Sequence, residues 1–154
     1  MTSPSDDRPT EGRFVGTEYR FPVRVQFEDT DLSGVVYHAD YLRFMERARS
    51  AMLRAVGVDQ RARFEAGGGA YAITALAIRY RAPARFEDVL VVTSRLVALR
   101  AASVDIQQRV RRGAAILADA TVTAALVSAT GRPIRQPQAC RDAFAGLVGA
   151  GSDI

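Results

Sequence analysis

The sequence of 154 residues contains one cysteine and no lysine, asparagine or tryptophan. A lone Cys140 can form neither an internal disulfide nor a cysteine-based metal cage, and its ordinary role is that of a small buried side chain. The absence of lysine excludes Schiff-base chemistry. His38 is the only histidine, and one histidine with one cysteine is too few for the usual metal clusters. We therefore expect no metal site and no cofactor.

Several catalytic signatures are also missing. There is no Gly-x-Ser-x-Gly motif, which leaves a serine hydrolase of the α/β-hydrolase type unsupported. There is no Walker sequence, and the run Gly67-Gly68-Gly69 lacks the spacing of a dinucleotide-binding loop. This run fits a flexible linker best, with a loop that moves for substrate as the alternative.

Long apolar stretches are absent as well. No run approaches the ~20 residues that a membrane-spanning helix requires, and residues 1–11 are polar, without the apolar core of a secretory signal. We therefore expect a cytoplasmic protein with no membrane span. The composition predicts a disordered N-terminal tail over 1–17, one domain over 18–147 and a C-terminal tail over 148–154.

All 21 basic residues are arginine, against 17 acidic residues, which gives a formal net charge of +4. One interpretation is a solvated surface. Another is attraction of an anionic ligand through bidentate contacts between guanidinium groups and phosphates. Nucleic-acid binding is not expected, because the arginines are scattered and only Arg109, Arg111 and Arg112 form a short cluster.

The periodicity of the apolar residues predicts one long helix and five strands. Over 41–56 these residues recur on one face at the helical period, and Gly57 stands where a C-terminal cap belongs. Alternating or continuous apolar runs predict strands over 18–27, 70–81, 88–99, 103–111 and 114–128. Residues 59–65 are expected to form a short polar helix or a turn, and 138–147 a short closing helix.

Consecutive strands form an antiparallel sheet, and a single long helix must bury its apolar face on that sheet. The fold class is therefore α+β, with a sheet of about five strands wrapped around one central helix. Residues 70–81 are apolar on both faces, so we expect them to form a central strand beneath the helix.

The segment between the first strand and the long helix gathers side chains capable of catalysis. Asp29 and Asp31 stand two residues apart, the small pair Ser33-Gly34 follows, and His38 precedes the helix. Asp31 could be a general base or a nucleophile, although taken alone it is more simply a turn residue that bonds local backbone. His38 could be an acid, a base or an orienting donor, or a capping or packed residue.

The backbone amides at the start of the helix, near Val36 to His38, are candidates for binding a developing oxyanion. Tyr37 could form a wall of the same site. The alternative for these residues is packing at the start of the helix.

Two motifs resemble those of a known family. The stretch Glu28-Asp-Thr-Asp-x-x-Gly-Val-Val-Tyr-His-x-x-Tyr-Leu-Arg-Phe-x-Glu-Arg-Ala-Arg49 resembles the signature of the YbgC-type acyl-CoA thioesterases, relatives of 4-hydroxybenzoyl-CoA thioesterase with the hotdog fold. Tyr80-Arg-Ala-Pro-Ala-Arg-Phe-Glu-Asp88 is similar to a second segment of that family. The resemblance covers about 21–144. This chain has Asp40 where the family usually has asparagine, which adds a negative charge beside the expected site.

The resemblance implies the hotdog fold, with Asp31 as the catalytic aspartate and His38 as the family's histidine. Asp29 is expected to orient the turn. Four further residues are then expected to contact the substrate or its oxyanion: Gly34, Val36, Tyr37 and Tyr41. The resemblance also implies a homodimer with active sites at the subunit interface, often paired into tetramers.

We therefore predict an acyl-CoA thioesterase, which hydrolyses a fatty or aromatic acyl-CoA to the free acid and coenzyme A. Asp31 would attack the thioester or activate water, and the sequence leaves both roles open. One alternative is a thioesterase for acyl-carrier protein, and another is a non-enzymatic acyl-CoA-binding subunit. The presence of both Asp31 and His38 argues against the latter.

Overall fold

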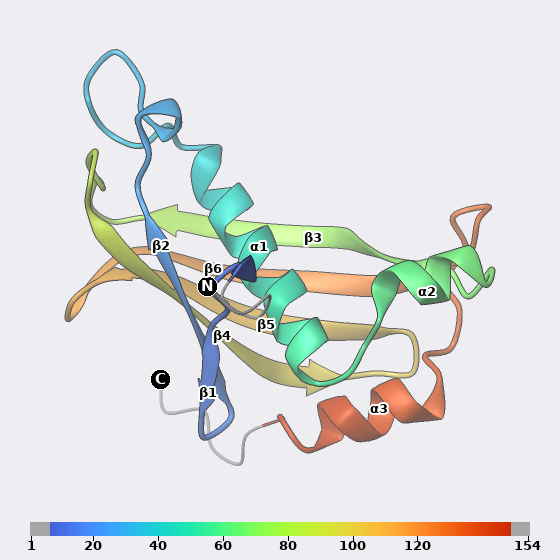
Figure 1. Cartoon of the computed structure of the whole chain (residues 1–154). Coiled ribbons are helices and arrows are strands. Elements are labelled where there is room, and N and C mark those ends of the chain that lie inside the picture. Colours follow the sequence, from blue (N-terminus) through green and yellow to red (C-terminus); the bar gives the residue numbers. More distant parts are fainter. Residues whose placement is uncertain (1–6, 149–154) are drawn as a thin grey trace.

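The computed structural model describes residues 7–148 and shows one antiparallel sheet curved around one long helix (Figure 1). The strands are β1 Arg13–Val15, β2 Glu18–Arg24, β3 Ala70–Tyr80, β4 Val89–Leu99, β5 Ser103–Arg112 and β6 Ala115–Val127. Neighbouring strands follow the order β1-β2-β4-β5-β6-β3. The helices are α1 Asp40–Ala55, α2 Gln60–Glu65 and α3 Gln138–Ala145. The α+β architecture of the sequence prediction is confirmed.

Helix α1 lies on one face of the sheet and supplies the centre of the core. Burial of each large apolar side chain contributes about 1.5–3 kcal/mol relative to exposure. The helix ends as predicted, because Gly57 adopts the left-handed conformation with φ of 84°. The buried apolar residues of the helix are Tyr41, Phe44, Met45, Ala48, Ala51 and Met52, and the sheet meets the first part of the helix with Leu90, Val92, Val110, Leu117 and Val122.

One buried polar side chain, Gln108 of β5, fastens α1 to the sheet. Its amide nitrogen donates at 2.9 Å to the backbone carbonyl of Met45 and at 2.9 Å to the hydroxyl of Ser94 on β4. Its carbonyl oxygen accepts a hydrogen bond of 2.9 Å from Nη1 of Arg49. Because Gln108 has no exposed surface, these bonds form in a medium of low dielectric constant and define how α1 sits on the sheet.

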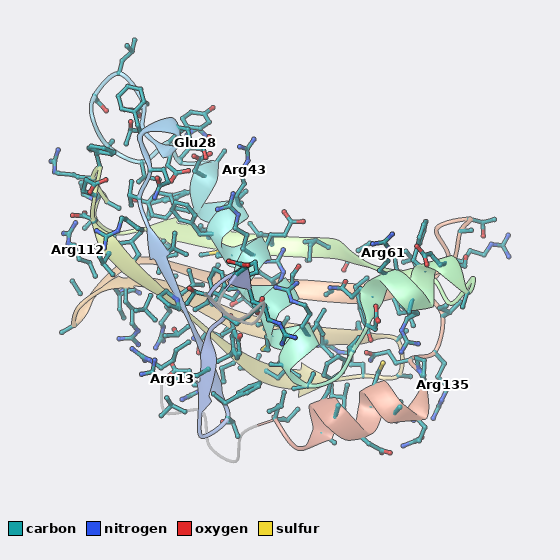
Figure 2. The ribbon with its side chains drawn as sticks, in the orientation of Figure 1. Arg13, Glu28, Arg43, Arg61, Arg112 and Arg135 are labelled. Carbon is teal, nitrogen blue, oxygen red and sulfur yellow. The ribbon has the colours of Figure 1, made fainter. Side chains whose placement is uncertain are left out.

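The opposite face of the sheet is rich in arginine. Figure 2 labels arginines on several elements of the fold: Arg13, Arg43, Arg61, Arg112 and Arg135. Directly paired residues on one face lie about 4.5–5.5 Å apart between Cβ atoms. One row of such pairs crosses all six strands and is called here the arginine row. It contains four arginines and only one carboxylate. Its members, one from each strand, are Arg13, Arg20, Thr93, Arg109, Asp119 and Arg79.

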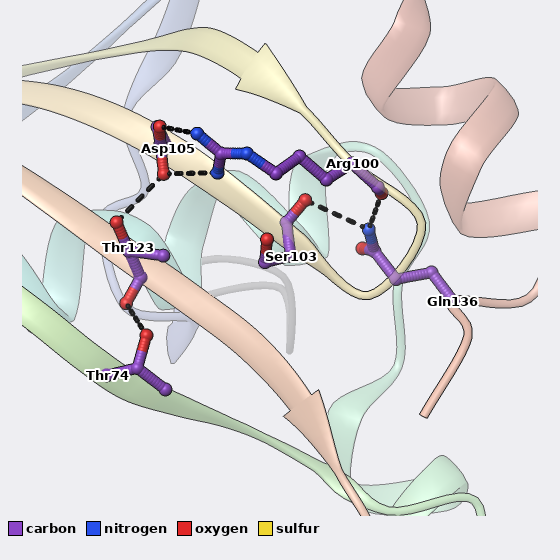
Figure 3. A network of polar contacts seen from close by, with 6 residues as sticks. All are labelled: Thr74, Arg100, Ser103, Asp105, Thr123 and Gln136. Carbon is purple, nitrogen blue, oxygen red and sulfur yellow. Dashed lines mark hydrogen bonds and ion pairs between the residues drawn. The ribbon is translucent and has the colours of Figure 1, made fainter. Parts of the chain in front are cut away.

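A polar network closes the end of the sheet near α3 (Figure 3). Arg100 donates to both carboxylate oxygens of Asp105, at 2.9 and 2.6 Å, and lowers the pKa of that carboxyl. The hydroxyl of Thr123 donates to the same carboxylate at 2.8 Å. The buried amide of Gln136 donates to the carbonyl of Arg100 at 2.9 Å. The network thereby ties the turn between β4 and β5 to the segment that leads into α3.

Two strand predictions are wrong in detail. The strand predicted over 18–27 leaves the sheet after Arg24, and Phe27 lies in a short 3-10 helix with 78% of its surface exposed. The strand over 70–81, expected at the centre beneath the helix, is β3 at the edge of the sheet. Its only strand neighbour within residues 7–148 is β6, a long-range pairing that the local pattern does not encode.

The sheet has six strands because Arg13–Val15 pair with the start of β2, within the segment expected to be a disordered tail. Residues 1–6 of that tail, and 149–154 of the expected C-terminal tail, lie outside the described residues. None of the helices within 7–148 is long and apolar enough to cross a membrane.

Replacing Gln108 with alanine should lower the free energy of unfolding by about 2–4 kcal/mol, because the Ser94 hydroxyl and the Arg49 guanidinium lose a buried partner. Urea denaturation measures the change. Gln107→Ala is the matched control, since the neighbouring side chain points to the opposite face and should cost about 0.5 kcal/mol or less. Equal losses in the two variants would contradict a specific role of Gln108.

Candidate active site

The loop between β2 and α1 is held in one shape by short backbone pairings. Thr30 pairs with Val36, and Val35 pairs with Arg85. Gly34 has a φ of 80°, and its amide donates to the carbonyl of Asp31 at 3.0 Å. Residues with a Cβ rarely adopt this conformation, so Gly34 accounts for the tight turn that follows Asp31.

Asp31 is exposed at this turn and its carboxylate is stabilised from one side. The backbone amide and the hydroxyl of Ser33 donate to Oδ1 of Asp31, at 2.8 and 2.5 Å. These two bonds hold the pKa of the Asp31 carboxyl below its usual value. Asp31 is therefore ionised at neutral pH, with Oδ2 facing solvent as a base or a nucleophile.

His38 lies two residues before α1, beside two tyrosines. Its ring centroid is 4.4 Å from that of Tyr37 and 6.4 Å from that of Tyr80, the latter in an edge arrangement. The hydroxyl of Tyr80 donates at 2.7 Å to the backbone carbonyl of His38. The end of β3 thereby fixes the backbone at His38.

Asp31 and His38 line one open cleft of 380 Å³. The structure thus brings the two predicted catalytic residues together, along with two of the four predicted contact residues. The other two, Gly34 and Tyr37, do not line the cleft, whereas the end of β3 contributes residues that the sequence analysis did not propose for the site. The lining consists of Asp31, Val35, Val36, His38, Tyr41, Tyr80, Arg81, Ala82 and Pro83.

The expectation for the oxyanion-binding amides is wrong for two residues. The amide of Val36 donates to the carbonyl of Ala84 at 2.8 Å, and that of Tyr37 donates to the carbonyl of Asp29 at 2.8 Å. Both bonds belong to the pairings that shape the loop, so these amides are already used. The His38 amide has no backbone acceptor within residues 7–148, and it remains a candidate donor to an oxyanion.

Tyr41 forms the inner wall of the cleft rather than an exposed contact. Its side chain is buried, and its hydroxyl accepts a hydrogen bond of 3.0 Å from the amide of Ala84. Burial raises the pKa of Tyr41, so the phenol stays neutral. The hydroxyl is thus held in place to fix the wall.

The rim of the cleft carries one arginine, which an ion pair connects to the arginine row. Arg81 lines the cleft, and its Nη2 lies 3.3 Å from Oδ2 of Asp119. The other oxygen of Asp119 lies 3.5 Å from Nε of Arg109. Within residues 7–148, no group of three or more histidine, cysteine, aspartate or glutamate side chains could hold a metal ion. The arrangement suits nucleophilic or base-assisted attack on a carbonyl, next to positive charge.

Comparison with known proteins identifies relatives of the whole domain. Residues 25–144 match a family model described as the thioesterase-like superfamily. The protein named acyl-CoA thioesterase YbgC from Haemophilus influenzae is 39% identical over 127 residues, which cover 82% of this chain and 93% of the relative. A protein from Escherichia coli O157:H7 named acyl-CoA thioester hydrolase YbgC is 43% identical over 94 residues, 61% of this chain and 69% of the relative.

Solved structures agree on the fold. A probable thioesterase from Bartonella henselae is 35% identical and superposes with a TM-score of 0.73, covering 78% of this chain and 99% of that one. A 1,4-dihydroxy-2-naphthoyl-CoA thioesterase from Synechocystis, 20% identical, superposes with a TM-score of 0.78 over 86% of this chain and 99% of that one, and supports the fold alone.

Ser33→Ala should raise the pKa of Asp31, because it removes the hydroxyl that contributes most to stabilising the carboxylate. Titration of the Asp31 carboxyl carbon by NMR measures this shift. Thr30→Val is the matched control, since the Thr30 hydroxyl donates to the carbonyl of Phe27 and not to Asp31. An unchanged pKa in Ser33→Ala would show that the hydroxyl does not stabilise the carboxylate.

Proposed function

Because the chain belongs to the thioesterase-like superfamily, we propose that it is an acyl-CoA thioesterase, which hydrolyses the thioester of a fatty or aromatic acyl-CoA to a free acid and coenzyme A. The observation that carries the proposal is the shared cleft of Asp31 and His38. Its chemistry matches the activity for which the Haemophilus and Escherichia relatives are named.

The reaction needs a nucleophile and a place for negative charge on the thioester oxygen. Asp31, ionised and exposed, either attacks the carbonyl carbon and displaces the thiolate, leaving an acyl-aspartyl anhydride that water then hydrolyses, or takes a proton from the water that attacks the carbonyl directly. The amide of His38 donates to the developing oxyanion, and the His38 imidazole positions the carbonyl or passes a proton to the leaving thiolate. No metal ion or redox cofactor is required for these steps.

Arginines at and near the rim of the cleft support coenzyme A as the carrier of the acyl group. Arg81 at the cleft leads to Arg109 on the arginine row through their common contact with Asp119. Guanidinium groups bind phosphates with paired hydrogen bonds. Comparing hydrolysis of one acyl group on coenzyme A and on acyl-carrier protein separates this proposal from the carrier-protein alternative. A series of fatty and aromatic acyl-CoAs then defines the acyl preference.

The edge strand β3 supports assembly of the chain into a homodimer. Ile73, Leu76 and Tyr80 point to the same face as α1 but remain 44%, 38% and 43% exposed, although Tyr80 packs edge-on against Tyr41 of α1 with ring centroids 5.3 Å apart. The outer side of β3 pairs with no strand in the described part of the chain. Joining two β3 edges would extend the sheet and cover these side chains with a second subunit.

Such a homodimer would place a partner subunit beside Tyr80, at the border of the cleft, and so put the active site at the subunit interface. Assembly into tetramers and a cytoplasmic location stay predictions of the sequence analysis.

Asp31→Asn should lower kcat by about 10²–10⁴-fold, because it keeps the size of the side chain but removes its charge and basicity. The melting temperature and the binding of acyl-CoA should change little. Release of free thiol measures kcat, and calorimetry on the same preparation measures folding.

The matched control is Asp59→Asn, which alters the distant N-cap of α2, where asparagine caps equally well. A variant Asp31→Asn with normal kcat and a lowered melting temperature would instead assign Asp31 a purely structural role in the turn.

Leu76→Arg should convert a dimer into a monomer, because it places a charge in the apolar edge that the partner is proposed to cover. Light scattering at micromolar concentration measures the mass. Ala77→Arg is the matched control, since Ala77 points to the opposite face of the same strand and should leave the mass unchanged. A wild-type protein that is monomeric and fully active would overturn the proposed dimer.

A further inference from the structure

The face of the sheet opposite α1 contains a hollow of 240 Å³ whose lining residues are all polar. The cleft of Asp31 and His38 shares none of these residues, so the hollow is separate from the candidate active site. Strands β2, β4 and β5 contribute the lining, which consists of Glu18, Thr93, Arg95, Gln107, Arg109 and Arg111.

The register of β4 and β5 brings three arginines together. Thr93 lies directly opposite Arg109, and Arg95 lies directly opposite Gln107. Arg95 and Arg109 are therefore diagonal neighbours, about 7–8 Å apart at the backbone. Arg111 follows two residues after Arg109, on the same face of β5. Thr93 lines the hollow and is only 3% exposed, so it lies at the floor.

Few carboxylates balance these guanidinium groups. Glu18 is the only acidic residue of the lining, and its carboxylate already lies 3.4 Å from the guanidinium of Arg20. Within residues 7–148, neither Arg95 nor Arg111 forms an ion pair with a carboxylate. The next acidic residue on this face of β5, Asp105, belongs to the network of Figure 3. The hollow thus has an excess of positive charge.

Arg109 and Arg111 are also incompletely satisfied as hydrogen-bond donors. The Nε atoms of both are buried and have no hydrogen-bond acceptor among residues 7–148, whereas buried donors in folded proteins are nearly always paired. The ion pair of Arg109 with Asp119 is long, at 3.5 Å, although the Arg109 side chain is only 20% exposed. An anion on the terminal nitrogens of these guanidinium groups would compensate their charge.

We propose that this hollow, called here the arginine hollow, binds a phosphate group. A phosphate ester carries nearly two negative charges at neutral pH and offers three strong acceptor oxygens. Guanidinium groups bind such oxygens with paired hydrogen bonds, and the Thr93 hydroxyl and the Gln107 amide are further donors at the same place. A carboxylate, with one charge and two oxygens, is satisfied by a single arginine, whereas three arginines suit the higher charge of a phosphate.

Two sources of the phosphate group fit this position. One is coenzyme A, since Asp119 contacts both Arg109 of the hollow and Arg81 of the cleft. The other is a separate phosphorylated molecule, since the hollow opens on the face opposite α1, and β5 lies two strands, about 10 Å, from β3. The first source rests on the proposed function, whereas the site itself does not.

Titration with inorganic phosphate at constant ionic strength tests the site, with binding followed by calorimetry and by the NMR signals of the arginine Nε–H groups. Phosphate should shift the signals of Arg95, Arg109 and Arg111, and chloride at the same ionic strength should not. Arg111→Gln should lower the phosphate affinity about 10-fold or more, because it removes a charged donor. If this variant does not fold, Arg95→Gln carries the same test.

Arg135→Gln is the matched control, because it removes the same charge from an exposed position outside the hollow (Figure 2). It should change the phosphate affinity less than about 2-fold, since salt screens a distant exposed charge. Phosphate binding no stronger than that of chloride would overturn the site, and so would equal affinities of Arg111→Gln and Arg135→Gln.

Two further measurements distinguish the sources. Competition by the adenosine bisphosphate moiety of coenzyme A, together with a raised KM for acyl-CoA in Arg111→Gln, would assign the phosphate group to the substrate. Loss of phosphate binding with an unchanged KM would assign it to a separate molecule. A protein that binds phosphate in the expected way but hydrolyses no acyl-CoA would contradict only the proposed function.

Discussion

The structure depends on the burial of one face of α1 against the sheet. The helix fills the concavity with aromatic and sulfur-containing side chains, and Gln108 gives it one orientation through bonds to Met45, Ser94 and Arg49. A purely apolar contact would tolerate sliding or rotation, since hydrophobic attraction has no direction. The polar contacts remove that freedom. Bonds inside the core therefore define the position of the first turn of α1 and of the loop that leads into it.

The candidate site takes its shape from two segments far apart in the sequence. The loop after β2 supplies Asp31 and His38, while the end of β3 supplies Tyr80 and Arg81. The bridge between Val35 and Arg85 and the bond from Tyr80 to the His38 carbonyl hold these segments together. The backbone of the site is therefore hydrogen-bonded to the end of the edge strand β3.

Much of this was predictable from local patterns. The apolar period fixed α1 and its end at Gly57, and the motif around Asp31 and His38 located both residues of the cleft. The edge position of β3 was not predictable, because strand order arises from long-range pairing. Residues 70–81 are apolar on both faces, and this pattern fits a central strand as well as an edge strand that a partner covers. The hydrogen bonds of the Val36 and Tyr37 amides were not predictable either, because their acceptors are the backbone carbonyls of Ala84 and Asp29. The second motif, from Tyr80 to Asp88, was the available signal for the far wall of the cleft.

The arginine row has a chemical consequence for a protein that handles activated acyl groups. Thioesters transfer their acyl group to side-chain amines, and each such transfer removes a positive charge from a lysine. The guanidinium of arginine stays protonated and is a poor nucleophile under the same conditions. Because every basic side chain of this sequence is arginine, the surface keeps its charge, and with it the attraction for phosphates, throughout exposure to the protein's own proposed substrate.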